Sequence, residues 1–307
     1  MSRRKGRAVD GVLLLDKPRG ITSQTAVSRV KALFGAAKAG HTGTLDPLAD
    51  GLLPVCLGEA TKFSQGLLDA DKAYRAIVRL GIRTATGDLE GEVLDTRPVT
   101  STAAAIRQAA ATFAGDILQV PPMYSALKRD GRPLYAYARA GEVVDREPRR
   151  VTIRSITVVA VNLPDVTIDV VCSKGTYIRV LAEDFGAVLG CGAALAGLTR
   201  TAVGELLLAD AITFPALEAT PAAARTACLR PVDGLVTALP RLECSADEAR
   251  RLGHGQAFLR AGLAGGGARR AYDPDGVFLG MVEAAADGRI VPLRLVSLRP
   301  RAGPDGL

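Results

Sequence analysis

The stretch GHTGTLDPLADG, from Gly40 to Gly51, constrains this chain more than any other part of its sequence. Its glycines let the backbone approach a ligand closely, and Pro47 keeps the preceding residue out of a helix. The window alone leaves two interpretations open. It is either a pair of turns with solvated acids or a shaped loop that presents the Asp46 carboxylate to a site.

Hydrophobic periodicity predicts strands and helices on both sides of this loop. Strands are expected at residues 11–15, 72–80, 151–161, 166–172, 195–201 and 203–208, and helices at residues 22–35, 59–68, 102–113 and 178–189. Residues 16–20 are expected to form a turn, whereas Pro54 leaves the type of residues 52–57 open. Alternation in the strand at 72–80 turns Tyr74 toward the core.

Tyr177 and Arg179 lie at the start of the helix predicted at residues 178–189. The helix dipole makes a cation unfavourable near a helix N-terminus. A buried anionic partner would explain Arg179, and so would a position on the surface. Both explanations stay open on the spacing alone.

Composition narrows the class of protein. No uninterrupted apolar run approaches the roughly 18 residues of a membrane helix, so we expect a soluble, cytoplasmic protein with no export signal. The five cysteines are widely spaced and form no C-x-x-C pair, which argues against a zinc site and a disulfide framework. Only two histidines are present, so catalysis would have to use carboxylates, arginine, lysine or tyrosine.

The net charge of +7 says little, but its distribution is informative. Between residues 122 and 154, eight basic residues accompany four acids and three tyrosines. The basic residues are Lys128, Arg129, Arg132, Arg139, Arg146, Arg149, Arg150 and Arg154. This mixture is typical of a surface that binds phosphates and stacks on bases, although a solvated helical face would have the same composition.

A domain boundary is expected near Pro240, where a loosely patterned stretch with several prolines ends. Beyond it, Ser245 and Glu248 predict a capping box, and short strands follow near residues 269–273, 277–282 and 291–296. The expected division is a basic tail at 1–9, a main domain at 10–240 that carries a basic segment at 119–150, a small β-rich domain at 241–300 and a tail at 301–307.

Five segments together resemble the TruB family of tRNA pseudouridine synthases, in matching order and spacing over nearly the whole chain. They are GVLLLDKPRGITS (11–23), AGHTGTLDPLADGLLPVCLGEATK (39–62), DKAYRAIVRLG (71–81), QVPPMYSALKRDGRPLYAYARAG (119–141) and CSKGTYIRVLAEDFG (172–186). The resemblance implies an α+β fold with a central mixed, mainly antiparallel sheet flanked by helices. It also implies that the C-terminal domain is a PUA-like RNA-binding domain.

The family isomerises one uridine in the T loop of tRNA, at position 55, to pseudouridine. The resemblance implies the same activity here, with the tRNA T arm as partner, without cofactor or metal, in a monomer. By the same resemblance, Asp46 is the catalytic aspartate, Tyr74 stacks on the target base and Arg179 pairs with the aspartate. The residues expected to contact the substrate or RNA are His41, Tyr177, Lys17, Lys128, Arg129, Arg132 and Arg149, with Lys17 and Pro18 supporting the site.

The residue types suit this chemistry. A carboxylate can bond to the sugar C1′ or to the uracil ring, or it can take a proton. A bidentate Arg179 would keep Asp46 ionised, and the Tyr74 hydroxyl is a candidate acceptor of the C5 proton. Asp50 invites a two-carboxylate glycosidase interpretation, but a turn or capping role before Gly51 is simpler.

Two other functions remain possible from the sequence. The chain could be an RNA-binding or RNA-folding factor whose Asp46 loop is dispensable. It could also be a hydrolytic nucleosidase, which would release free uracil.

Overall fold

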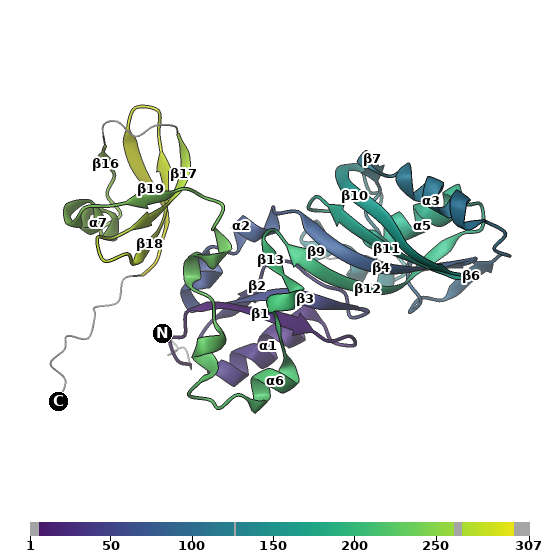
Figure 1. Ribbon diagram of the computed structural model, residues 1–307, viewed down its shortest axis with the longest axis horizontal. Helices are drawn as coiled ribbons and strands as arrows, with labels where there is room; N and C mark the ends of the chain where they lie inside the picture. The colour runs from purple at the N-terminus through teal and green to yellow at the C-terminus, as the bar shows by residue number, and fades with distance from the viewer. Residues whose placement is uncertain (1–5, 126, 261–265, 298–307) are drawn as a thin grey trace.

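The computed structural model of the protein describes residues 6–125, 127–260 and 266–297 (Figure 1). Arg3, Arg4 and Lys5 of the expected basic tail lie outside the described residues, as do Ala126 of the basic segment and the tail at 301–307. The described residues form a ten-stranded sheet, a separate five-stranded sheet and two small hairpins.

The ten-stranded sheet runs in the order β14-β1-β3-β12-β4-β11-β10-β7, with β2 beside β3 and β13 beside β12. Its strands are β1 (Gly11–Lys17), β2 (Ala39–His41), β3 (Ala49–Leu57), β4 (Lys72–Leu80), β7 (Gly115–Gln119), β10 (Arg149–Asn162), β11 (Asp165–Cys172), β12 (Ala193–Val203), β13 (Leu206–Leu207) and β14 (Ile212–Thr213). Neighbouring strands are antiparallel apart from the pairs β1–β14 and β3–β12. The sheet is therefore mixed and mainly antiparallel, which confirms the predicted fold class.

Helices and short hairpins fill the connections of this sheet. The helices are α1 (Ser23–Phe34), α2 (Gln65–Leu68), α3 (Ala103–Ala111), α4 (Leu134–Arg139), α5 (Ile178–Val188) and α6 (Phe214–Ala219), and the hairpins pair β5 (Ile82–Thr84) with β6 (Val93–Thr96) and β8 (Lys128–Arg129) with β9 (Arg132–Pro133). The helix predicted at residues 22–35 is present as α1, and its two end residues cap it: Thr22 Oγ1 accepts a hydrogen bond from Thr25 N, and Gly35 takes a left-handed conformation with φ of 59°.

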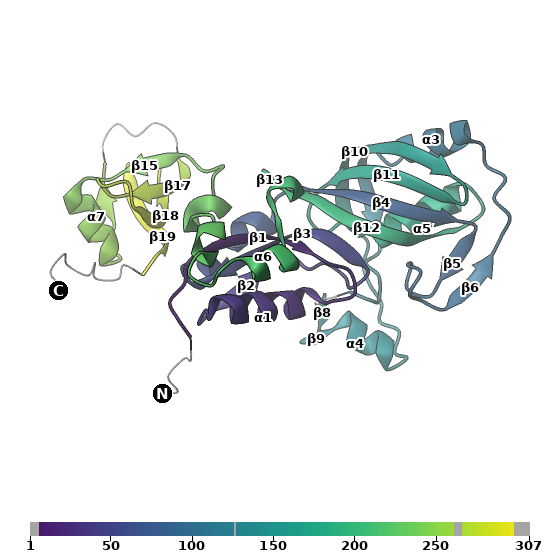
Figure 2. The same ribbon diagram turned by 60° about the horizontal axis from the view of Figure 1, so that its bottom comes forward.

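Two hydrophobic clusters meet beneath Tyr74. Helix α1 packs on β1 and β3 and forms one cluster with them, whereas α3 and α5 pack on the half of the sheet that contains β4, β11 and β10 (Figure 2). Tyr74 and Leu198 contact both clusters. The two residues therefore mark the seam between the halves of the molecule.

The chain beyond Pro240 folds into a small module with a core of its own. Its elements are β15 (Arg241–Glu243), α7 (Ala246–Gly253), β16 (Phe258–Leu259), β17 (Gly267–Tyr272), β18 (Phe278–Ala284) and β19 (Arg289–Leu295). The capping box of Ser245 and Glu248 is present at the start of α7. The Phe278 ring lies 5.2 Å from that of Phe63, between centroids, so the module packs directly on the larger part of the protein.

Strand pairing corrects three local predictions. The turn expected at residues 16–20 begins later, because β1 continues to Lys17 and pairs there with Gly51. Residues 52–57 are part of β3, which starts at Ala49, so Asp50 and Gly51 lie in a strand and the turn or capping role expected for Asp50 is wrong. The two strands expected at 195–208 are mainly one long strand, β12.

The cysteines are all free, and four of the five are buried. Within the described ranges, none of the helices has the length and apolar character to span a lipid bilayer.

Candidate active site

A cleft of about 430 Å³ opens at the seam of the large sheet. It lies within the range of ~300 to 1,000 Å³ that is typical of ligand sites. Four residues predicted from the sequence line it: Asp46, Tyr74, Tyr177 and Arg179. The rest of the lining consists of Thr42, Gly43, Thr44, Leu45, Leu68, Lys72, Ser125, Leu127, Ser173, Lys174, Gly175, Thr176, Ile178, Leu198 and Arg200.

Asp46 lies in the loop between β2 and β3, and contacts from distant segments hold the backbone of this loop. The buried Ser23 Oγ, at the start of α1, accepts a hydrogen bond from Leu45 N (2.8 Å) and donates one to Leu45 O (3.0 Å). Arg200 donates to the two carbonyls that precede Leu45, at 3.2 and 3.4 Å. The position of the carboxylate is therefore set by the fold before any ligand binds.

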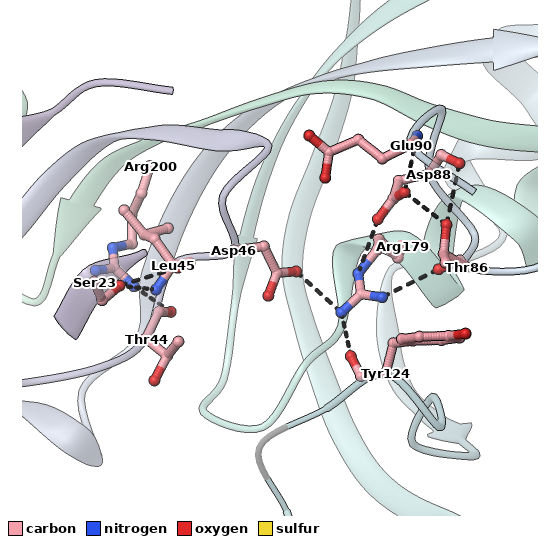
Figure 3. Close-up of polar contacts among 10 residues, drawn as sticks. All are labelled: Ser23, Thr44, Leu45, Asp46, Thr86, Asp88, Glu90, Tyr124, Arg179 and Arg200. Atoms are coloured by element: carbon pink, nitrogen blue, oxygen red, sulfur yellow. Dashed lines mark hydrogen bonds and ion pairs between the residues drawn. The ribbon is translucent and has the colours of Figure 1, made fainter. Parts of the chain in front are cut away.

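Arg179 faces Asp46 from the first turn of α5, and its side chain is 6% exposed. Its Nη2 lies 3.0 Å from Asp46 Oδ2 and donates to Tyr124 O at 2.6 Å, while Nη1 donates to Thr86 O at 3.1 Å (Figure 3). Nε lies 3.8 Å from Asp88 Oδ2. The expected bidentate grip on Asp46 is absent, because Nη1 donates to the Thr86 carbonyl and Nε faces the Asp88 carboxylate. The ion pair uses one carboxylate oxygen, and the Asp46 side chain remains 42% exposed.

Sequence reasoning missed two residues of this arrangement. Asp88 is buried and lies near Arg179, but nothing in the sequence around it distinguishes its carboxylate from others. Arg200 is 2% exposed and lines the cleft. The strand prediction at 195–201 contained a signal for it, because a charged residue near the middle of a mostly apolar strand needs a buried partner.

Tyr74 lies on β4 at the seam and is half-buried. Burial raises the pKa of the Tyr74 hydroxyl above its ordinary value, and the nearby Arg200 guanidinium opposes that rise. Lys72, two residues earlier, donates to the carbonyls of Leu67, Leu68 and Ala70 at 2.6 to 3.1 Å. Burial lowers the pKa of Lys72 to about 8.

His41 lies beside the cleft. It lines a second cavity of about 540 Å³ that shares Asp46 and Arg179 with the first. His41 Nδ1 accepts a hydrogen bond from Gly43 N at 3.2 Å, and burial lowers the pKa of the imidazole. Tyr177 lines the cleft itself.

Lys17 does not fit the prediction that it contacts RNA. Its side chain is fully buried, and Nζ donates to Pro18 O and Ile21 O at 2.9 Å each. Burial lowers the pKa of Lys17 to about 8. Lys17 therefore fixes the connection between β1 and α1, which agrees with the expected structural support but leaves no surface for a phosphate.

The basic segment remains at the surface. Lys128, Arg129 and Arg149 are exposed, and Arg149 begins β10. Arg132 pairs with Glu142 at 2.9 Å. Among the described residues, no acid forms an ion pair with Lys128, Arg129 or Arg149, so their charges remain available to an anion.

The described ranges contain no group of three or more histidine, cysteine or acidic side chains that could hold a metal ion. The arrangement at the cleft is instead one carboxylate, two tyrosines and two buried arginines. It can offer an anion to a ligand beside an aromatic ring and hold that anion in a fixed position.

Three family models match consecutive parts of the chain. They describe the N-terminal domain of the TruB family pseudouridylate synthases (residues 31–178), the C-terminal domain of tRNA pseudouridylate synthase B (179–237) and the C-terminal region of pseudouridine synthase II TruB (240–296). A curated tRNA pseudouridine synthase B from Burkholderia mallei is 58% identical over 94% of this chain and 98% of its own length. A relative of the same name from Thiobacillus denitrificans is 56% identical over 95% and 97%, respectively.

Solved structures agree with this result. The chain is similar to one in a Cbf5-Nop10-Gar1 complex, with a TM-score of 0.70, 27% identity and coverage of 93% of this chain and 84% of that chain. A chain of an H/ACA RNP bound to a substrate RNA gives a TM-score of 0.71 over 98% and 92%, at 23% identity, which supports the fold alone. By sequence over nearly its full length, and by the fold built around the Asp46 loop, this chain belongs to the TruB family of pseudouridine synthases.

Proposed function

We propose that this tRNA pseudouridine synthase converts the uridine at position 55, in the T loop of tRNA, to pseudouridine. Asp46 would act as the nucleophile or catalytic carboxylate, Arg179 as its ion-pair partner and Tyr74 as the ring that stacks on the base. The shared name of the curated relatives supports tRNA as the substrate. One observation carries the assignment of residues: the cleft holds a single aspartate, fixed by its loop and paired with a buried arginine, beside a tyrosine.

The carboxylate is suited to the first step. Detaching the base from C1′ requires a group that can bond to the sugar or to the ring, or that can accept a proton. Arg179 Nη2 lies 3.0 Å from Oδ2 of Asp46, and among the described residues no hydrogen bond goes to Oδ1. One oxygen is thus held in place while the other remains available to the nucleotide.

The target base must leave the stacked loop before it can reach Asp46. Everting a nucleotide costs a few kcal/mol, and stacking on an aromatic ring returns roughly 1 to 3 kcal/mol of that cost. The position of Tyr74 supports this role, because Tyr74 lines the cleft from β4. Its hydroxyl would then accept the proton that leaves C5.

The charged surface supports a tRNA-sized ligand. The exposed Lys128, Arg129 and Arg149 would contact phosphates, whereas Arg132 is already paired with Glu142. The C-terminal module would add contacts outside the cleft, as expected of a PUA-like domain. We propose that the enzyme acts as a cytoplasmic monomer.

Release of tritium from tRNA labelled at uridine C5 tests the proposal. The wild-type protein should release label, and Asp46→Asn should not. Asp50→Asn is the matched control, because Asp50 lies four residues further on in β3 and outside the cleft lining. It should retain nearly full activity.

Each alternative has its own result. Retained label with the wild-type protein would contradict the isomerase, and free uracil in the product would indicate a nucleosidase. Full rescue of a deletion strain by Asp46→Asn would show that RNA binding or folding is the main role. Chemical mapping of the pseudouridine in the product tests the proposed position.

A further inference from the structure

A second buried arginine stands on the opposite side of the Asp46 loop from Arg179 (Figure 3). Arg200 is 2% exposed, and its hydrogen bonds go to backbone carbonyls: Nε to Leu52 O (2.8 Å), Nη2 to Gly43 O (3.2 Å) and Nη1 to Thr44 O (3.4 Å). Among the described residues, no carboxylate forms an ion pair with it. A buried charge without a counter-charge is costly, so this arginine needs an explanation beyond packing.

The strand register places Arg200 between Tyr74 on β4 and Gly51 on β3. It pairs with Tyr74 across β12 and β4, and with Gly51 across β12 and β3. Residues directly opposite in an antiparallel pair project to the same face, so the guanidinium lies beside the phenol ring. Gly51 has φ of 94°, and a Cβ there would lie 2.5 Å from Arg200 O. The glycine therefore permits the close approach of β3 to β12 at this point.

We propose that Arg200 is a positioning residue of the isomerisation: it fixes the backbone of the Asp46 loop relative to Tyr74 and presents an unneutralised positive charge to the Tyr74 hydroxyl. This rests on the proposed function, in which Tyr74 takes the proton from C5, and it adds that Tyr74 does so as the phenolate. In that step the C5–H bond breaks and its electron pair forms the C5=C6 double bond, while the pair of the C6=N1 double bond moves onto N1. The proton from C5 goes to the phenolate oxygen, and N1 takes a proton from solvent. Arg200 transfers no proton, because a guanidinium stays charged.

The groups around Tyr74 give the charge of Arg200 a specific consequence. Asp46 in the loop and Cys172 on β11 add to the effect of burial and raise the pKa of the Tyr74 hydroxyl, whereas Arg200 on β12 lowers it. Lys72 lies two residues away on the same strand, with its ammonium bound to carbonyls. Loss of Arg200 should therefore move the Tyr74 pKa upward and leave less phenolate at any given pH.

The first measurement is the single-turnover rate on tRNA as a function of pH, for Arg200→Met and Arg200→Lys. We expect Arg200→Met to lower the rate at neutral pH by about 100-fold, the loss typical of a missing electrostatic contact at a reacting group. The tRNA dissociation constant should change by less than about threefold, because Arg200 is buried. The rising limb of the rate profile should move to higher pH. Arg200→Lys should restore part of the rate and return the pH profile most of the way to that of the wild type.

A matched control separates positioning from folding. Arg225 also donates to backbone carbonyls, those of Leu33, Leu217, Glu218 and Thr220, and does not line the cleft. Arg225→Met should lower the melting temperature and leave the rate and its pH profile unchanged. The proposal would be overturned if both variants lost rate in proportion to their loss of stability.

The second measurement needs no turnover. The chain has six tyrosines and no tryptophan, so biosynthetic fluorotyrosine gives few fluorine resonances, and that of residue 74 is the one lost in Tyr74→Phe. Fluorination also lowers the phenol pKa into an accessible range. Without RNA, the titration of this resonance should move to higher pH in Arg200→Met and return most of the way in Arg200→Lys.

The two measurements fail separately. An unchanged titration midpoint in Arg200→Met would overturn this inference even if the enzyme isomerises tRNA. If Arg200→Met does not fold, the same titration in Arg200→Gln decides the question. Absence of tritium release by the wild-type protein would overturn the proposed function without affecting the titration.

Discussion

The cleft and the basic segment both display arginines, but they place them in opposite environments. In the cleft, the guanidinium groups of Arg179 and Arg200 are almost fully buried and contact residues far away in the sequence. In the basic segment, Lys128, Arg129 and Arg149 are exposed, and the hydrogen bond of Arg129 goes to the carbonyl of a residue in the same segment, at 2.7 Å.

The difference assigns the two regions separate tasks. A buried charge is desolvated when the chain folds, so it can act on a reacting group at full strength in a medium of low polarity. An exposed charge stays hydrated and contributes to RNA affinity mainly through the release of counterions. Substitutions in the cleft should therefore change the rate, and substitutions in the basic segment should change the affinity and its salt dependence.

Arg179→Lys should give the largest effect that tests this separation. Lysine keeps the charge, but it cannot bond to Asp46 and to the carbonyls of Thr86 and Tyr124 with a planar fork. We expect a loss of about 10³-fold in the single-turnover rate, with a tRNA dissociation constant within about threefold of wild type. A variant that bound tRNA poorly but turned it over at a normal rate would contradict the separation.

Tyr74→Phe should have the next largest effect. Phenylalanine keeps the stacking surface and removes the oxygen that would accept the C5 proton, so a loss of about 10²-fold in rate is expected at unchanged affinity. Tyr74→Leu should weaken affinity as well, because it removes the ring. Full turnover by Tyr74→Phe would eliminate the hydroxyl from the mechanism and leave stacking alone.

Replacing both Lys128 and Arg149 by alanine should change binding without changing chemistry. The slope of log affinity against log salt should become shallower by about one for each cation removed, and affinity at low salt should fall by about tenfold. The rate at saturating tRNA should stay at the wild-type value. Arg132→Ala is the control within the same segment, since Glu142 already neutralises that charge. A slope change in the control as large as that of the double variant would show that exposure does not decide which cations meet phosphate.

The sequence predicted features that depend on residues close together in the chain. It missed features that depend on pairing between strands that are far apart in the chain. Thr22 and Gly35 were identifiable as caps of α1 because a cap depends on its neighbours in the chain. Asp50 was assigned to a turn, but it lies in a strand because its position pairs in parallel with Thr199, on a strand about 150 residues away. No local pattern encodes that pairing.

The same limit applies at the site. The partnership of Arg179 and Asp46 was suggested by resemblance, and the structure adds what surrounds it. The carbonyls of Thr86 and Tyr124 take the other edges of the guanidinium, so the contact is through one oxygen where two were expected. Arg200 lacked a predicted role because its three carbonyl partners become neighbours only when β3 and β12 pair.

His41→Gln should give the smallest effect. It tests a residue that lies between the cleft and the basic segment. His41 lines the second cavity and accepts from Gly43 N, so glutamine should weaken tRNA binding by only a few-fold and leave the maximal rate nearly unchanged. Burial lowers the folded-state pKa of His41, so the unfolded chain binds a proton more readily. The stability contributed by neutral His41 is therefore present above pH ~6.5 and declines as the pH falls below that value. Thermal unfolding between pH 5 and 8 should show this decline in the wild-type protein and a weaker one in His41→Gln, and equal acid sensitivity in both would place the responsible group elsewhere.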